Sequence, residues 1–228
     1  YNAGGHIILD DINGDNYLDP VIGLGSAVLT FDGSDIEGSS LHHFSFGQVN
    51  CSLPRVCCVD LDGMGNKEII SATNNTIRII SVDGSWNMSV VDSLNFNQTI
   101  SSGPLATDID GDGSPELILG VKNTTSDSYH IYVFDENLDE ENEWQGIELG
   151  GILDGKIVID DLDNNGNQEI IMTADTDDGR FLYVFKTPWG FSGDSYWASD
   201  KGNIQNTGAA KRFIGGTYNG SLTLCRDV

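Results

Sequence analysis

The sequence is poor in basic residues. Its 228 residues include 11 Lys and Arg against 35 Asp and Glu, so the formal net charge is −24. With so few basic side chains the protein could neutralise few phosphate groups, which argues against nucleic-acid and anionic-membrane partners. No apolar run approaches the roughly 18 residues of a membrane-spanning helix, and no charged and apolar leader precedes Tyr1. We therefore expect that the protein does not insert directly into a membrane. We also expect that the sequence is a processed or excised segment.

Groups used in catalysis are also scarce. Only four His occur, no Ser lies in a nucleophile elbow, no His pair has zinc-protease spacing, and no Gly-rich loop precedes a helix to hold phosphate. The adjacent His42 and His43 lie in an expected outer strand, where alternation turns one ring toward neighbours and the other toward water. The sequence therefore predicts a protein that is not an enzyme.

Acidic residues, in contrast, are abundant and gather in four similar stretches. DINGDNYLDPVI begins at Asp11, DLDGMGNKEII at Asp60, DIDGDGSPELI at Asp108 and DLDNNGNQEII at Asp161, which places the starts 49, 48 and 53 residues apart. A second landmark, seen as LTFDGS, ISVDGS, YVFDEN and YVFKTP, recurs at intervals of 51, 52 and 51 residues. Two landmarks that share one period indicate four copies of a unit of about 50 residues.

Each unit is expected to consist of short strands. Apolar runs rich in Ile and Val stand before and after each acidic stretch, then come a third run and a weaker fourth, and helical periodicity is hardly visible. Four strands per repeat of this length are typical of a propeller blade, because neighbouring blades bury faces that one blade leaves exposed. We therefore predict an all-β fold, a β-propeller with four four-stranded blades at approximately 5–50, 51–100, 101–150 and 151–200. Residues 1–228 would form one propeller domain or propeller segment, in which 201–228 supply a closing strand or tail.

The acidic stretches have the composition of cation-binding loops. Carboxylate or amide oxygens at positions 1, 3 and 5, a main-chain oxygen at position 7 and a carboxylate at position 9 can surround one hard cation, while Gly at position 6 allows the turn. Calcium fits this set better than magnesium, which keeps its waters in a tighter octahedron. Acidic turns without a metal are the alternative. A helical calcium-binding loop would need an acid at position 12, where the sequence has Ile22, Ser71, Leu119 and Met172.

The pattern D-x-[DN]-x-[DN]-G-x-x-[DE] between two strands, repeated at about 50 residues, resembles the FG-GAP, or VCBS-type, repeats of integrin α-subunit propellers and their microbial relatives. The resemblance covers approximately residues 5–200. It implies calcium ions that hold adjoining strands in register at one rim and are structural rather than catalytic. Carried over by position, the expected metal-binding residues are Asp11, Asn13, Asp15, Tyr17 and Asp19 in the first loop; Asp60, Asp62, Asn66 and Glu68 in the second; Asp108, Asp110, Asp112, Ser114 and Glu116 in the third; and Asp161, Asp163, Asn165, Asn167 and Glu169 in the fourth.

Two loops depart from this pattern. Asn16 replaces Gly at position 6 of the first loop, and since Asn tolerates a left-handed backbone better than most residues, the loop should persist. In the second loop Met64 stands at position 5, and a thioether is a poor ligand for a hard cation. We therefore expect up to four Ca²⁺ sites, of which the one at Asp108 is the tightest and the one at Asp60 the weakest.

The number of blades stays open. The resemblance implies seven blades more often than four, so the four units either close alone or belong to a larger, for example seven-bladed, ring. The stretch YWASDKGNIQNTG, with Trp197 and Gly208, resembles a Trp-to-Thr-Gly signature found where microbial propellers of this kind finish, or it is an ordinary strand and loop. Residues 209–228 would then add one or two strands that close a ring or pair with an outside partner.

Cysteine and asparagine usage bears on the compartment. Cys51, Cys57, Cys58 and Cys225 are few for a disulfide scaffold but permit bridges, such as one from Cys225 to Cys51, and their spacing does not assign the pairing. Cys57 and Cys58 are adjacent in an expected strand and should point to opposite faces, one of them into the core. The sequence also contains six N-x-[ST] glycosylation sequons, which begin at Asn50, Asn74, Asn87, Asn97, Asn123 and Asn219. Together with calcium sites, these sequons favour a glycoprotein that is secreted or lies at the cell surface.

Three functions are compatible with the sequence. The first, which we predict, is a non-catalytic extracellular recognition or adhesion module that presents its other loops to a protein or glycan ligand. The second is a carbohydrate-active enzyme, since some polysaccharide lyases resemble the same repeat architecture, although few basic residues are present to hold an acidic polymer. The third is a structural subunit of a surface filament or coat that self-assembles through exposed strand edges.

Overall fold

The structure is a computed structural model that describes residues 6–24, 26–35, 41–46, 55–123, 125, 128–140, 147–149, 152–153, 156–163, 165–176, 179–187 and 195–197. These residues form strands, turns and loops, without a helix among them. The all-β class predicted from the sequence is confirmed. Accordingly, the described part of the chain offers no helix that is long and apolar enough to cross a membrane.

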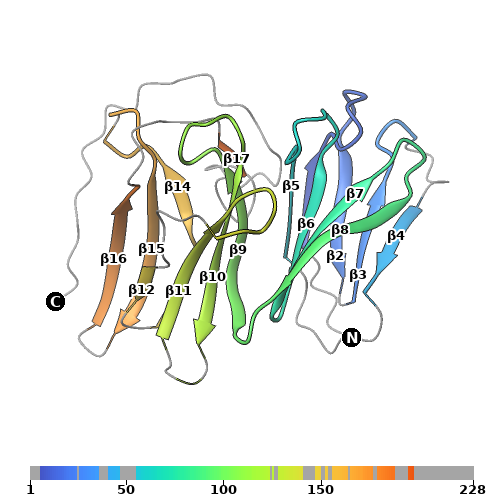
Figure 1. Ribbon diagram of the computed structural model, residues 1–228. Coiled ribbons are helices and arrows are strands. Elements are labelled where there is room, and N and C mark those ends of the chain that lie inside the picture. Colours follow the sequence, from blue (N-terminus) through green and yellow to red (C-terminus); the bar gives the residue numbers. More distant parts are fainter. Residues whose placement is uncertain are drawn as a thin grey trace.

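The described strands form four antiparallel sheets in sequence order (Figure 1). The first sheet has the order β1-β2-β3-β4 and the second β5-β6-β7-β8. The third has the order β12-β11-β10-β9-β17, and in the fourth β13 and β14 pair with one edge of β15 while β16 pairs with the other. The strands are β1 His6–Asp10, β2 Asp19–Leu24, β3 Ala27–Phe31, β4 Leu41–Ser45, β5 Arg55–Val59, β6 Glu68–Thr73, β7 Thr76–Val82, β8 Met88–Asn95, β9 Thr99–Thr107, β10 Glu116–Asn123, β11 Ser128–Phe134, β12 Ile147–Leu149, β13 Ile152–Leu153, β14 Val158–Asp160, β15 Glu169–Thr176, β16 Gly179–Lys186 and β17 Ser195–Trp197.

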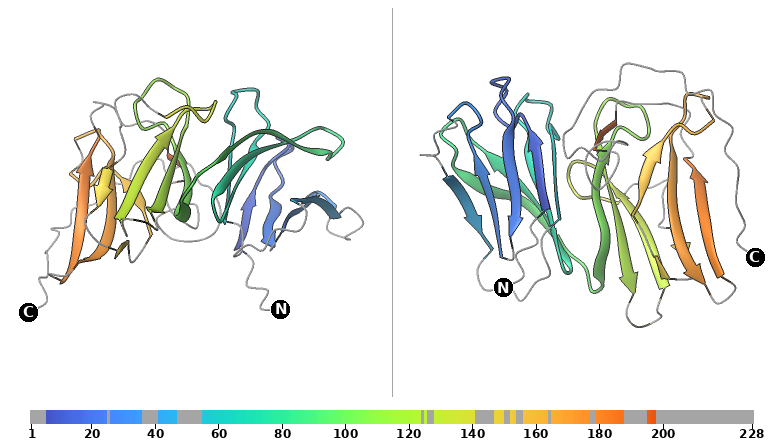
Figure 2. Two further views of the ribbon diagram at one scale, coloured as in Figure 1. Left: turned by 60° about the horizontal axis from the view of Figure 1, so that its bottom comes forward. Right: turned by 180° about the vertical axis from the view of Figure 1, so that it is seen from behind.

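Consecutive sheets lie beside one another and bury the faces between them. Strands β1 and β2 contact β5, β4 contacts β8, β5 and β6 contact β9, and β11 contacts β13. The two further views in Figure 2 keep the same order of sheets from the N-terminal to the C-terminal side. A sheet with a neighbour on each side needs apolar residues on both faces, which explains the near-continuous Ile and Val runs of its inner strands.

Strand β5 shows how this packing determines burial. It belongs to the second sheet and contacts strands of both the first and the third sheet. Alternation turns Cys57 and Cys58 to opposite faces, as predicted. Both thiols are free, and both are buried because both faces of the strand are covered. The sequence predicted one of the two thiols in the core, and the structure buries both.

Aromatic rings complete the contacts between sheets. Phe96, just after β8, lies against Tyr132 and Phe134 of β11, with ring centroids 6.0 and 5.8 Å apart. His42 of β4 stacks on Trp86, in the turn between β7 and β8, at 5.1 Å between centroids, while His43 is exposed. This is the division of the two His rings that alternation along the strand predicts.

The chain after the fourth sheet departs from the expected order. Strand β17 includes Trp197 and pairs with β9, so it adds a fifth strand to the third sheet. No described residues after β16 supply the fourth strand expected in the last unit. Several predictions concern residues outside the described ranges: a bridge between Cys225 and Cys51, the sequons at Asn50 and Asn219, the signature up to Gly208, and the tail at 201–228.

The turn after β3 offers a test of the packing. The Gly33 N–H donates to Asp19 Oδ1 at 2.7 Å, and a Cβ on Gly33 would lie 2.1 Å from the Leu18 carbonyl oxygen. Because the backbone would have to shift, we expect Gly33→Ala to lower the free energy of unfolding by about 1–3 kcal/mol. Urea unfolding followed by circular dichroism measures this change.

Gly84 supplies the matched control, since it occupies the same place in the second unit and a Cβ there would have no atom within 4 Å. We expect Gly84→Ala to change the free energy of unfolding by less than about 0.5 kcal/mol. Equal effects of the two substitutions would contradict the described contact between this turn and the first acidic loop.

Candidate metal sites

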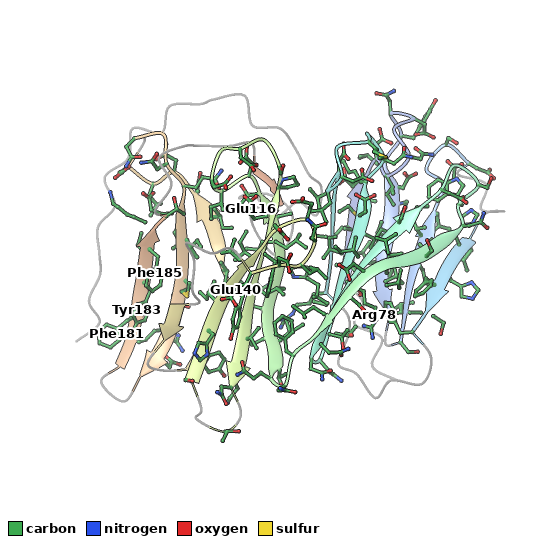
Figure 3. All side chains as sticks on the ribbon, in the orientation of Figure 1. Arg78, Glu116, Glu140, Phe181, Tyr183 and Phe185 are labelled. Atoms are coloured by element: carbon green, nitrogen blue, oxygen red, sulfur yellow. The ribbon has the colours of Figure 1, made fainter. Side chains whose placement is uncertain are left out.

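Each acidic loop joins two paired strands that are consecutive in the chain: β1 and β2, β5 and β6, β9 and β10, and β14 and β15. Antiparallel pairing places position 9 of the loop opposite the residue just before position 1, which we number position 0. The four loops lie at the same end of the sheets in Figure 1, and Glu116 marks the third in Figure 3. The position 0 and position 9 residues pair as Asp10↔Asp19, Val59↔Glu68, Thr107↔Glu116 and Asp160↔Glu169.

Left-handed backbone curls each loop back on itself, at one position in all four loops and at a second position in three of them. Position 6 has a positive φ in all four loops, at Asn16 (71°), Gly65 (93°), Gly113 (98°) and Gly166 (94°). The expectation that Asn16 would replace Gly in this conformation is confirmed. Position 4, which the pattern search passed over, has a positive φ at Gly14, Gly63 and Gly111. Gly at that position in three of the four loops was the signal available in the sequence.

The position 9 carboxylate closes each loop with the same hydrogen bond. It accepts from the backbone N–H of position 2, deep between the strands, and the four carboxylates are at most 5% exposed. One oxygen of each acid is thereby satisfied by the loop itself. The bonds are Ile12 N to Asp19 Oδ2 (3.0 Å), Leu61 N to Glu68 Oε2 (2.9 Å), Ile109 N to Glu116 Oε2 (2.7 Å) and Leu162 N to Glu169 Oε2 (2.9 Å).

Three of the four loops bring acids from positions 1, 3 and 9 together. In each of these loops, one oxygen from every acid lies within 4.8 Å of the other two. Such spacing lets three carboxylates share one cation, and without a cation it places like charges side by side. The groups are Asp60, Asp62 and Glu68; Asp108, Asp110 and Glu116; and Asp161, Asp163 and Glu169.

Buried oxygens without a partner test whether these groups suit a cation. Asp60 Oδ1 and Glu169 Oε1 are both buried and lack a hydrogen-bond partner. A buried, unpaired carboxylate oxygen is costly, and a hard cation is the group that would satisfy it. The second and fourth loops therefore contain acceptor oxygens that fit a divalent metal ion.

In the third loop, the cost of burying clustered carboxylates is seen in the pKa of two acids. Burial, opposed by the Ile109 hydrogen bond and assisted by the neighbouring Asp110, Asp108 and Asp112 charges, raises the pKa of Glu116 to about 8. Burial likewise raises the pKa of Asp108. Glu116 and Asp108 are thus poorly solvated as anions, and a bound cation would reverse this disadvantage.

The first loop satisfies its acids differently. Asp19 is one methylene shorter than Glu, and its second oxygen accepts from Gly33 N, so both oxygens are engaged. Asp11 accepts from the backbone N–H of Gly14, Asp15 and Asn16. The predicted ligands Asp11, Asn13, Asp15 and Asp19 are present, but this loop has no group of three acids as close as those in the other loops.

Positions 5 and 7 form a small turn in three loops. Tyr17 N donates to Asp15, Ser114 N to Asp112 and Asn167 N to the Asn165 side chain, at 2.7–2.8 Å. Asp112 is exposed and lies outside the close group of the third loop. In the second loop the exposed Met64 offers no oxygen to Asn66. Ligation through the main-chain oxygens of Tyr17, Asn66, Ser114 and Asn167 stays a prediction.

Sequence reasoning missed a lysine at the fourth loop. Lys186 Nζ lies 2.9 Å from Asp163 Oδ2, and this hydrogen bond lowers the pKa of Asp163. The second landmark carries Asp at this place in the other three units and Lys here, which was the available signal. The ammonium group competes with a cation for the Asp163 carboxylate, so the fourth loop should bind a cation less tightly than the third.

Glu116 predicts how stability without metal depends on pH. Because its pKa rises on folding from 4.5 to about 8, the folded state favours the protonated acid. This stabilisation is complete below about pH 4.5 and is lost as the pH rises through about 8. In the presence of chelator we therefore expect the melting temperature to fall over this interval, and Glu116→Gln to flatten the fall.

Glu136, an exposed acid elsewhere in the third unit, gives the control substitution Glu136→Gln, which should leave the pH profile unchanged. Differential scanning fluorimetry across the interval compares the three proteins. A Glu116→Gln profile as steep as that of the unmodified chain would show that this buried acid does not govern the dependence.

Comparison with known proteins adds no assignment: no protein-family model matches the chain, and no curated protein matches it either.

Proposed function

We propose that the protein is a calcium-binding β-propeller that acts outside the cell as a non-catalytic recognition or adhesion module. The observation that carries this proposal is the recurrence of three close acidic groups, each at the same point of its hairpin in three successive sheets. Identical placement favours a shared structural role for the bound ion over a single catalytic centre.

The propeller part of the proposal is supported by the arrangement of the sheets. Apart from β17, which joins the third sheet from later in the chain, the described sheets are built from consecutive antiparallel strands, and each packs against the next in sequence order. A repeat that buries its faces only against its neighbours is the unit from which propellers are built. In this interpretation the four sheets are blades, and the acidic loops lie on one rim.

Calcium is supported by the ligand chemistry. Apart from Met64, the side chains at positions 1, 3, 5 and 9 of the loops offer carboxylate and amide oxygens in partly exposed turns, a combination that suits Ca²⁺ better than Mg²⁺ or thiol-seeking metals. A bound Ca²⁺ neutralises the carboxylates and links the two strands of a hairpin. Four such ions would change the formal net charge from −24 to −16.

The recognition role is supported by what the rest of the surface contains. Strand β8 is exposed along most of its length, with Val90 and Val91 among its outward residues. Asn87 and Asn97, which begin two of the sequons, are exposed on the same unit. A rigid framework with exposed polar and apolar positions suits a protein or glycan ligand at the cell surface, and the scarcity of basic side chains disfavours an enzyme for acidic polymers.

Calcium titration tests the proposal directly. We expect saturable binding by calorimetry and a higher melting temperature in calcium than in chelator. Binding to the folded state alone stabilises it by about 2.7 kcal/mol when the free ion is at a hundredfold excess over Kd. Magnesium at the same concentration serves as the control and should shift the melting temperature less. Absence of both binding heat and a melting shift would refute the metal proposal.

The order of the sites can be tested with two substitutions. Met64→Asp supplies the missing position 5 oxygen of the second loop, and Lys186→Met frees Asp163 in the fourth. Each should tighten calcium binding at its own loop by about three- to tenfold, whereas Lys122→Met at the opposite end of β10 changes the net charge equally and should have little effect. If all three variants bind alike, net charge rather than loop geometry determines affinity.

A further inference from the structure

At two of the three junctions between sheets, position 8 of an acidic loop contacts position 0 of the preceding unit. Lys67, at position 8 of the second loop, places its Nζ 2.6 Å from Oδ1 of Asp10, at position 0 of the first. The Lys67 N–H also donates to the Ile12 carbonyl at 2.8 Å. Asp10 is 3% exposed, so this ion pair is part of the packed junction between the first and second sheets.

The other two junctions place matched residues at the same two positions. Between the third and fourth sheets, Thr107 Oγ1 donates to Gln168 Oε1 at 2.8 Å, and both residues are buried. Between the second and third sheets the two positions hold Val59 and Pro115, which are also buried. The residues at positions 0 and 8 are thus an anion and a cation at the first junction, two apolar residues at the second, and a hydroxyl and an amide at the third.

The two ends of the row of sheets carry unmatched junction residues. Leu18, at position 8 of the first loop, is 52% exposed. Asp160, at position 0 of the fourth loop, accepts one backbone hydrogen bond, from Asp161 N at 3.0 Å. No Lys or Arg in the described ranges pairs with it. Asp160 corresponds to Asp10 and lacks only the equivalent of Lys67.

The faces beside these residues are also uncovered. Leu182 and Val184 of β16 are 46% and 42% exposed, whereas their counterparts Ile131 and Val133 in β11 are fully buried. In Figure 1 β16 lies at one end of the row of sheets. At the other end Ile7 of β1 is 57% exposed, whereas its counterpart in the second sheet, Val56, is buried. Each end therefore exposes the face that the neighbouring unit covers elsewhere.

We propose that this face of the fourth sheet binds a further repeat unit of the same kind, whose loop carries Lys or Arg at position 8 to pair with Asp160. The existing junctions provide the geometry, and the Asp10–Lys67 pair provides the chemistry. The chain's own first unit fits poorly, because Leu18 would then lie on the Asp160 carboxylate. The inference depends on the repeated packing of the sheets and not on whether the loops bind calcium.

A substitution in the full chain converts its first unit into the expected partner. Leu18→Lys places the cation at position 8, so that one copy can bind the fourth sheet of another in a head-to-tail manner. Sedimentation velocity should show association with a dissociation constant at least about tenfold lower than that of the unmodified chain. Adding Asp160→Asn to Leu18→Lys should abolish the gain, and raising the salt concentration should weaken it.

The charge-reversed pair provides the decisive control. Leu18→Glu alone should not associate, whereas Leu18→Glu combined with Asp160→Lys should restore association. Circular dichroism and melting temperatures compare the folding of all variants with that of the unmodified chain. The proposal is overturned if Leu18→Lys gains no association, if its association is indifferent to Asp160→Asn, or if the unmodified chain associates equally tightly.

Discussion

The structure depends on a carboxylate buried at the end of each acidic loop. In all four units this acid accepts a hydrogen bond from the N–H at position 2, and so joins the start of the second strand to the loop that leaves the first. One hydrogen bond leaves a second oxygen to be satisfied in a poorly solvated place. The first unit uses the Gly33 N–H for this purpose, and the others place further acids beside it. On our account a divalent cation completes those loops.

The acidic loops also lie where the hairpin meets the next sheet. Position 9 belongs to the loop, whereas position 8 reaches the preceding unit, as in the Lys67 to Asp10 ion pair and the Gln168 to Thr107 hydrogen bond. Fixing a loop therefore fixes a junction between sheets. A metal ion bound in a loop would therefore stabilise the adjoining junction as well as its own turn.

The sequence predicted what local spacing determines and missed what packing determines. Loop length and the left-handed Asn16 follow from residues within one turn, and the strands follow from alternating apolar runs. The Lys186 bond to Asp163 joins residues 23 apart, the Gly33 bond to Asp19 joins residues 14 apart, and β17 pairs with a strand far earlier in the chain. Such contacts depend on how the sheets meet, and a repeat pattern carries no direct signal for them. The absence of an oxygen at Met64, in contrast, was readable from the sequence alone.

The central claim is that cations among the acids hold the hairpins together, and hydrogen exchange with and without chelator tests it most directly. Removing calcium should speed amide exchange in the loops and flanking strands of the second, third and fourth units, above all at Leu61, Ile109 and Leu162, whose N–H groups bond to the buried acids. The first unit, whose Asp19 is satisfied by backbone N–H groups, should change least. Identical exchange in calcium and in chelator throughout all four units would contradict the account.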